Sequence, residues 1–427
     1  MLAPSRIPLN VPTFGQEETD EAMETLRSGM VTMGRKVRAF EEAWAKYCGR
    51  KYGIMTNSGS SANLVALTAL RCLGKLQEGD EVITPALTWA TTVFPIAQAG
   101  CVPVLADVDL ETYNLSLSAA TKALTKKTGA VMPVHLLGNP IVSTDAPRIV
   151  SHRDTRSPGL VLWDCCEAHG AQVRGRNVGS FGLAATFSFF FSHHISTVEG
   201  GMVVTDDLEF ADTCRSLRAF GWVRDMSDRE AFAKQHPDID ARFLFRYPGF
   251  NVRPMEVQGA FGLHQLPKLE GLIEHRRQVA FYWNSELETF SDYLQLPKEQ
   301  PGTRHVFFAY PFLLKPGCPF TRNEFREYLE ARGVETRQIE AGNMAIQPAM
   351  KYIRHRIAGP LTNAQYIHDN GFFIGCHQGV GEAEREAVVQ YCREFFERHH
   401  VGSSRSVQAQ SYSSYKVRGT PEDSHVV

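Results

Sequence analysis

The sequence predicts an α/β fold built on a mostly parallel sheet, and two observations lead to this prediction. Short apolar runs, each bounded by polar residues, glycine or proline, alternate with segments of helical period along the first part of the chain. The runs are continuously apolar, which is typical of strands in a parallel sheet that is covered on both faces. Such folds bind ligands where strands end and helices begin. Functional residues are therefore expected at the ends of these strands.

The elements follow one another in a clear order. A polar helix is expected over residues 19–27 and a second helix over 60–70, where Leu64, Leu67 and Leu70 share one face. The expected strands are 81–85, 102–108, 130–136, 159–164, 185–189 and 201–205. A long helical stretch begins over 256–272, and it is followed by a strand at 306–314 and by helices at 322–332 and 382–398.

These patterns divide the chain into two domains and a tail. We expect a large domain with the N-terminal segment over residues 1–255, and a smaller C-terminal domain over 256–400. Residues 401–427 are polar and rich in serine, which is typical of a disordered tail. The charged insertion at 224–246 is expected to form a surface loop over the site.

Charge and composition exclude several functions. The 427 residues include 45 Lys+Arg and 47 Asp+Glu, so the net charge of −2 offers no global positive field to nucleic acid or an anionic membrane. No apolar stretch approaches the roughly 20 residues that a bilayer span needs, and the N-terminus lacks the apolar core of a secretory signal. The nine cysteines are irregularly spaced, without a disulfide framework or a metal-binding pattern. We expect a cytoplasmic protein without a metal site.

Two candidate sites lie at expected strand ends. The run 57–63 (NSGSSAN) precedes a helix, and its Gly59 and Ser60 would let backbone N–H groups approach a phosphate at the helix N-terminus. The same residues could instead form only an N-capping turn. Asp164 ends an apolar run, where its carboxylate could keep a heterocyclic nitrogen protonated or simply face solvent.

A third candidate is the segment 186–201 (TFSFFFSHHISTVEGG). An aromatic strand leads through Ser188 to the adjacent His193 and His194. Adjacent side chains of a strand point to opposite faces, so these two imidazoles would not ligate one metal ion. The simplest alternative is one packed and one solvated histidine.

The order and spacing of these features resemble the fold-type I enzymes that use pyridoxal 5′-phosphate (PLP). More narrowly, they resemble the sugar aminotransferase/dehydratase family of nucleotide-sugar biosynthesis, over residues 6–395. The matching segments include NSGSSANL, GDEVITPALTWATTV, WDCCEAHGA, TFSFFFSHHISTVEGG, YPGFNVRPMEVQGAFGLHQL and ETRQIEAGN. The resemblance implies an aspartate aminotransferase-like fold with a large, mostly parallel sheet domain and a smaller C-terminal α/β domain.

The resemblance also assigns roles to residues around the cofactor. Gly59, Ser60 and Ser188 match the family's phosphate contacts. Trp89 matches an aromatic ring that stacks on the pyridine, although by itself it would be taken for a core residue. Asp164 matches the carboxylate that keeps the pyridine nitrogen protonated.

Two further residues imply an assembly. Asn251 matches a residue that reaches the phosphate of the neighbouring subunit, which implies a homodimer with shared active sites. Arg253 is a candidate for binding a carboxylate of glutamate, because its planar guanidinium suits that group. An exposed or interface arginine is the alternative.

One departure from the family pattern decides the expected activity. The family's aminotransferases carry a lysine that binds the cofactor covalently, and His193 stands at that position, five residues after Ser188. No lysine lies between residues 186 and 201. Imidazole cannot form that bond, yet its unperturbed pKa near ~6.5 makes it a good proton carrier. This exchange characterises the family's 3-dehydratases, and it implies that His193 is the catalytic residue.

The implied reaction is the PLP- and PMP-dependent removal of the C-3 hydroxyl from a 4-keto-6-deoxy sugar nucleotide. The resemblance favours GDP-4-keto-6-deoxymannose as the substrate and L-glutamate as the amino donor. The family's iron–sulfur branch has a Cys-x-Cys pair after an Arg-x-x-Gly segment, and 218–232 contains no cysteine. We therefore expect neither an iron–sulfur cluster nor a reductase partner. An aminotransferase-like enzyme for another 4-keto sugar and a non-catalytic binding relative remain alternatives.

Overall fold

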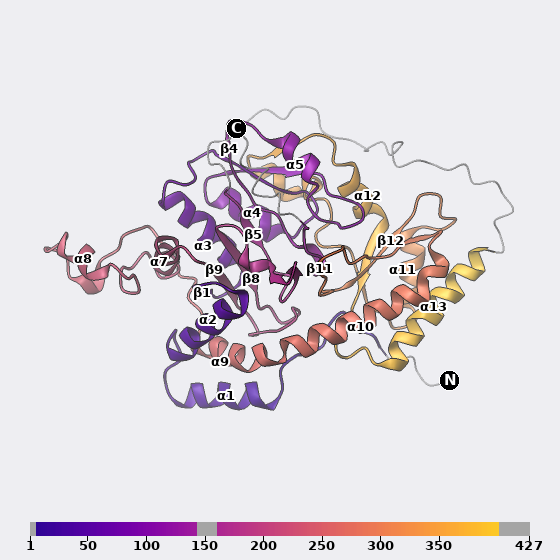
Figure 1. Cartoon of the computed structure of the whole chain (residues 1–427), viewed down its shortest axis with the longest axis horizontal. Coiled ribbons are helices and arrows are strands. Elements are labelled where there is room, and N and C mark those ends of the chain that lie inside the picture. The colour runs from indigo at the N-terminus through magenta and orange to yellow at the C-terminus, as the bar shows by residue number, and fades with distance from the viewer. Residues whose placement is uncertain (1–5, 143–159, 401–427) are drawn as a thin grey trace.

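The computed structural model describes residues 6–142 and 160–400. Figure 1 shows the N-terminal and central elements gathered around a sheet, and the C-terminal elements gathered at the far end of the long helix α10. The expected tail at 401–427 lies outside the described residues, as does part of the segment that follows Asn139.

Helices alternate with strands through the large sheet region. The helices of the described residues are α1 (Gln16–Arg27), α2 (Arg35–Cys48), α3 (Gly59–Cys72), α4 (Ala90–Gln98), α5 (Leu117–Ala123), α7 (Leu208–Leu217), α8 (Arg229–Lys234), α9 (Glu256–Gln265), α10 (Leu269–Leu287), α11 (Arg322–Glu330), α12 (Thr362–Asn370) and α13 (Glu382–His400). The strands of the large sheet are β1 (Tyr52–Thr56), β2 (Glu81–Pro85), β3 (Val102–Ala106), β4 (Thr128–Val131), β5 (Leu162–Asp164), β8 (Ala184–Ser188), β9 (Gly201–Thr205) and β14 (Arg356–Ile357). The shorter and C-terminal strands are β6 (Gln172–Val173), β7 (Arg176–Asn177), β10 (Leu294–Gln295), β11 (Thr303–Arg304), β12 (Tyr310–Leu314), β13 (Thr336–Arg337) and β15 (Gly371–Ile374).

The large sheet is mostly parallel, as the sequence predicted. One half has the strand order β14-β3-β2-β4, and all of its pairs are parallel. The other half has the order β1-β9-β8-β5, and parallel bridges from Val131 to Val161 and from Val134 to Asp164 join the halves. Strand β9 is the exception, because it runs antiparallel to both of its neighbours. The short segment 189–200 between β8 and β9 contains no crossover helix, so the chain reverses direction there.

Helices bury the sheet on both faces, which explains the continuous apolar runs. Every residue of β2, β3, β8 and β9 is buried. Helix α3 packs against α4, α7, β8 and β9, and α2 packs against β1. The start of α3 therefore lies beside the ends of β8 and β9, where the candidate residues of the sequence analysis meet.

The helix α10 connects two hydrophobic cores. Its first residues, including Ile273, belong to a core with Trp44 and Phe187, whereas Trp283 belongs to a second core with Phe312. Helix α9 packs against α1 and α2. We propose the division into a large domain up to residue 255 and a smaller domain from residue 256, with α9 packed against the large domain and β14 paired with β3 of the large sheet.

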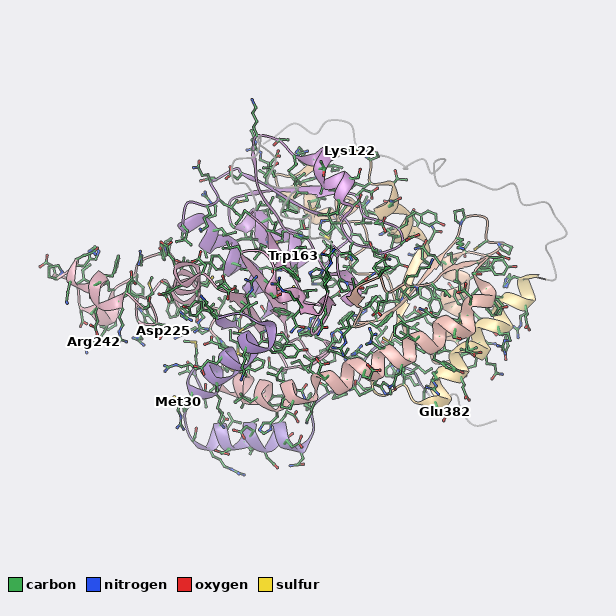
Figure 2. All side chains as sticks on the ribbon, viewed as in Figure 1. Met30, Lys122, Trp163, Asp225, Arg242 and Glu382 are labelled. Atoms are coloured by element: carbon green, nitrogen blue, oxygen red, sulfur yellow. The ribbon has the colours of Figure 1, made fainter. Side chains whose placement is uncertain are left out.

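The charged insertion at 224–246 is a surface segment, but it does not lie over the candidate site of its own chain. It contains α8, which projects from the edge of the molecule in Figure 1. Figure 2 labels Asp225 and Arg242 on this projection, far from Glu382 at the start of α13. None of its residues lines the cavity described below, so the expectation of a loop over that cavity is wrong for the single chain.

Five buried histidines among the described residues make the folded chain sensitive to acid. They are His135, His169, His194, His305 and His377. Burial lowers the pKa to about 3 for His135, His169 and His305 and to about 4 for His377. Burial also holds the pKa of His194 well below its usual value of 6.5. These imidazoles stay neutral in the folded chain, whereas the unfolded chain protonates them.

We expect the free energy of unfolding to fall as the pH drops below about 6.5, because the unfolded state then binds more protons. Each such histidine contributes a slope of about 1.4 kcal/mol per pH unit. The midpoint of urea unfolding should therefore be lower at pH 5.5 than at pH 7.5. The variant His135→Gln should reduce this difference, since an amide oxygen can still accept the Ile141 N–H bond (3.1 Å). Equal midpoints at the two pH values would contradict the prediction.

Candidate functional site

A cavity of about 360 Å³ lies at the carboxyl ends of β5 and β8. Figure 2 labels Trp163, which precedes Asp164 in β5, near the middle of the molecule. The cavity brings together residues from several distant segments, and those used below are Gly59, Ser60, Trp89, Thr92, Asp164, Glu167, Ser188, His193, Phe308, Arg337 and Glu340. It thus contains six of the eight candidate site residues of the sequence analysis, all except Asn251 and Arg253.

Gly59 and Ser60 form one side of the cavity at the start of α3. The Ser58 hydroxyl accepts the Ser61 N–H (3.1 Å) and caps the helix, so the capping turn is real. The N–H groups of a first helical turn have no intrahelical partner and carry the positive end of the helix dipole. Capping and anion binding therefore use different N–H groups, so this segment can both cap the helix and bind a phosphate.

Close approach between Gly59 and Ser188 shapes this side of the cavity. A Cβ atom on Gly59 would lie 2.5 Å from the Ser188 Cβ atom and 2.9 Å from its hydroxyl oxygen. Only glycine allows the helix start to contact the end of β8 in this way. The Ser188 hydroxyl is thereby placed beside the helix N-terminus, a donor set that fits a phosphate group.

Asp164 lies at the end of β5 with 3% of its surface exposed. One carboxylate oxygen accepts bonds from the Asn63 amide (3.0 Å) and the Thr92 hydroxyl (2.9 Å), and the other accepts the Cys166 N–H (3.1 Å). These bonds hold the carboxylate towards the cavity, where the oxygen that accepts the Cys166 N–H keeps a lone pair for a further donor. The alternative of a solvated aspartate at a strand end is wrong.

Trp89 stands before α4 at the wall of the cavity. Its side chain is 52% exposed, so the alternative of a core tryptophan is wrong. Its aromatic ring and the Asp164 carboxylate line the same cavity as the phosphate-binding side. This arrangement fits a flat, protonated heterocycle that carries a phosphate group.

His193 lines the cavity with a half-buried side chain. Its ring contacts Phe308 (5.3 Å between centroids) and His169 (5.6 Å), and its Nδ1 atom is buried without a hydrogen-bond partner among the described residues. Burial, together with the nearby His169 and the Arg276 guanidinium, holds the pKa of His193 well below 6.5. The imidazole is therefore neutral at physiological pH, which is the form that accepts a proton.

His194 is packed away from the cavity. Its side chain is fully buried, and its Nε2 atom is 3.0 Å from the Val306 carbonyl oxygen. The two histidines lie in a turn after β8, which ends at Ser188. They still point in different directions. Among the described residues, no group of three His, Cys, Asp or Glu side chains could hold a metal ion.

Asn251 and Arg253 do not line the cavity of this chain. The Arg253 guanidinium donates to the Asn251 side-chain oxygen (3.2 Å) and lies over the Phe220 ring, 4.7 Å from its centroid. Their separation from the cavity means that a single chain does not bring all the candidate residues together.

Two groups of residues in or beside the cavity were not predicted from the sequence. Asn63 and Thr92 support Asp164 and occur inside the segments that were matched as NSGSSANL and ALTWATT. Glu167, Arg337 and Glu340 also line the cavity. The sequence could have indicated these residues as well. Glu167 follows Asp164 by three residues, and Arg337 and Glu340 lie in the matched segment ETRQIEAGN.

Known proteins are similar to this chain along most of its length. The family model described as the DegT/DnrJ/EryC1/StrS aminotransferase family matches residues 12–393. The GDP-4-keto-6-deoxy-D-mannose 3-dehydratase of Yersinia pseudotuberculosis is 38% identical over 376 residues, which cover 87% of this chain and 94% of that protein. None of the described helices has the length and apolar character that a membrane span requires.

Two solved structures are also similar to this chain. The E. coli GDP-4-keto-6-deoxy-D-mannose-3-dehydratase with bound hydrated PLP matches with a TM-score of 0.82 at 35% identity, covering 91% of this chain and 98% of that one. A GDP-4-keto-6-deoxymannose-3-dehydratase with a trapped PLP–glutamate geminal diamine matches with a TM-score of 0.82 at 34% identity, covering 90% and 99%.

Proposed function

Because this chain belongs to the DegT/DnrJ/EryC1/StrS aminotransferase family, we propose that it is a PLP- and PMP-dependent 3-dehydratase of GDP-4-keto-6-deoxymannose. Glutamate is the amino donor. The fold is that of the fold-type I PLP-dependent enzymes, as the sequence predicted. The similar enzymes of Yersinia pseudotuberculosis and E. coli, both GDP-4-keto-6-deoxymannose 3-dehydratases, support the choice of sugar and nucleotide.

The observation that carries the proposal is an imidazole at the position of the family's lysine. His193 lines the cavity, and none of the residues that line it in the described chain is a lysine. Without that amine, the protein cannot hold the cofactor by a covalent bond, and amino-group transfer to the sugar loses its usual catalyst. A neutral imidazole can still remove a proton. Elimination is therefore favoured over transamination.

The cavity residues fit the cofactor. We assign the phosphate to the N–H groups of Gly59 and Ser60 and to the Ser188 hydroxyl, whose close packing leaves no room for a Cβ atom on Gly59. Asp164 would hold the pyridine nitrogen protonated, and the exposed ring of Trp89 would stack on the pyridine. When bound, the protonated pyridine supplies an electron sink.

His193 acts as the general base in this proposal. Its low pKa keeps it neutral before the reaction, so it can take a proton from the cofactor's methylene carbon. Asp164 keeps its orientation during this step, because three hydrogen bonds fix its two oxygens. With the cofactor bound, removal of this proton would favour loss of the C-3 hydroxyl, which leaves as water once a proton donor has protonated it.

We also propose a homodimer with shared active sites. Asn251 and Arg253 lie outside the cavity of their own chain, which is consistent with Asn251 reaching the phosphate in a neighbouring subunit and with Arg253 binding a glutamate carboxylate there. We place the enzyme in the cytoplasm, since all nine cysteines are unpaired, as is usual in a reducing compartment. The reaction needs neither an iron–sulfur cluster nor a reductase.

The proposed function predicts a defined stoichiometry. Purified protein incubated with PLP, L-glutamate and GDP-4-keto-6-deoxymannose should release one ammonia and one 2-oxoglutarate for each 3-deoxy-4-keto sugar formed. Enzymatic assays for ammonia and 2-oxoglutarate, with mass spectrometry of the nucleotide sugar, measure all three. Omission of glutamate is the control and should stop turnover. An amino sugar formed without ammonia would show an aminotransferase instead, and a cofactor absorbance that does not respond to glutamate would favour a non-catalytic binding protein.

A further inference from the structure

Two glutamate side chains meet at the wall of the cavity, and the mechanism above uses neither. Glu167 follows β5, whereas Glu340 follows β13 in the C-terminal part of the chain. Both line the cavity, and their carboxyl groups are joined by a hydrogen bond. A hydrogen bond between two carboxyl groups requires a proton on one of them, because two carboxylates offer only acceptors.

The surroundings indicate which group carries the proton. The Leu137 N–H donates to one oxygen of Glu167 (2.7 Å), which leaves the other oxygen for the bond to Glu340. Burial and then the Glu340 charge raise the pKa of Glu167 well above its usual value, and Asp164 adds to this. Burial also raises the pKa of Glu340, but Arg337 partly offsets that effect. Glu167 is therefore the acid and Glu340 the carboxylate that accepts its bond.

The backbone holds both partners in place. Glu340 and Leu137 have φ angles of 48° and 53°, in the left-handed region that residues with a Cβ atom rarely adopt. Such conformations persist where the surrounding structure fixes them, and they cluster at functional sites. In this protein one of them orients the Glu340 carboxylate and the other orients the N–H group that binds Glu167.

We propose that the Glu167–Glu340 pair is the acid that protonates the sugar's C-3 hydroxyl as it leaves. This inference rests on the proposed function. The O–H bond of Glu167 breaks as its proton passes to the hydroxyl oxygen, and the C–O bond breaks with its electron pair leaving on water. His193 gains one proton from the cofactor's methylene carbon in the same elimination. The site's net charge is unchanged, and return of the proton from His193 to the pair through water restores both groups.

A physical reason explains why His193 is the base and the Glu167–Glu340 pair is the acid. An efficient elimination needs a base that is neutral and an acid that is protonated at the same pH. The cavity supplies both, because burial acts in opposite senses on an imidazole and a carboxyl group. The other titratable or charged groups that face the pair are Asp164, Cys166 and Arg337, and His193 lines the same cavity.

The test compares two leaving groups. GDP-4-keto-6-deoxymannose is one substrate, and its analogue with fluorine in place of the C-3 hydroxyl is the other, because fluoride can leave without first gaining a proton. Glu167→Gln should lower kcat at least 100-fold on the hydroxyl substrate, within the range of about 10²–10⁴ for a general acid. The same variant should release fluoride within roughly tenfold of the wild-type rate, whereas His193→Asn should fail on both substrates.

Glu340→Gln provides a second readout. Without the Glu340 charge the pKa of Glu167 falls, so the decline of kcat at high pH should move to lower pH. Titration of PLP absorbance and thermal unfolding verify that each variant folds and binds the cofactor. Glu327→Gln is the matched control, because it removes one exposed carboxylate from α11 outside the cavity. It should behave as the wild type.

The possible outcomes separate the two proposals. Equal losses of Glu167→Gln on both substrates, full activity on the hydroxyl substrate, or an unmoved pH profile in Glu340→Gln would overturn the acid pair while the proposed function stands. If the wild type releases neither ammonia nor fluoride in the presence of glutamate, the proposed function fails and the acid pair fails with it.

Discussion

Replacing His193 with asparagine is expected to reduce turnover by about 10²–10⁴-fold while the protein still binds PLP. The imidazole is neutral in the folded chain because burial holds its pKa low, so asparagine changes neither the charge nor the approximate size of the side chain. What it removes is the group that accepts a proton, and general base catalysis contributes about 10²–10⁴-fold. Cofactor binding is measured by PLP absorbance, and turnover by ammonia release. Full activity of His193→Asn would remove this residue from the mechanism.

His193→Lys tests whether a side chain at this position reaches the cofactor. An amine placed at the cavity wall should bond covalently to the cofactor, and borohydride should make that bond permanent, detectable by mass spectrometry. The His193→Asn protein is the matched control and should show no such adduct. Some formation of an amino sugar by the lysine variant would indicate that this one side chain separates elimination from transamination. A lysine variant without the adduct would show that the side chain at 193 does not reach the cofactor.

Gly59→Ala is expected to weaken PLP binding by roughly 100-fold, the cost that a shift of about 1 Å in a positioning group can have. The new Cβ atom would lie 2.5 Å from the Ser188 Cβ atom, which is too close for both segments to stay where they are. Either the start of α3 or the end of β8 must move, and the phosphate donors then separate. Equilibrium titration of PLP against the apoprotein measures the change.

Gly271→Ala is the matched control for this substitution. Gly271 lies inside α10, and a Cβ atom there would meet nothing within 4 Å. Because alanine favours a helix over glycine, we expect unchanged PLP binding and a gain of about 0.5–1 kcal/mol in the free energy of unfolding. PLP binding by Gly59→Ala as tight as that of the control would show that the cofactor phosphate lies elsewhere.

Local sequence patterns predicted six strands of the large sheet, but missed β1, β14 and some helices. The strands expected at 81–85 and 201–205 have those bounds as β2 and β9, because continuous apolar runs between polar or glycine residues are hard to place otherwise. Helix α2 was missed although Val37, Phe40 and Trp44 form a buried face at helical spacing. Helix α4 carries Pro95 in its interior, and proline normally argues against a helix.

The sequence by itself determined the chemical groups available to this protein. It showed a histidine where the family has a lysine, a carboxylate at a strand end and a Ser/Gly turn before a helix, since residue types and spacing depend on no contact between distant segments. The tertiary structure decided how those groups behave. It buried His193 enough to lower its pKa, separated Asn251 and Arg253 from the cavity, and joined Glu167 to Glu340 across 173 residues of chain. Burial and distant contacts arise only when the elements pack, and a sequence pattern does not contain them.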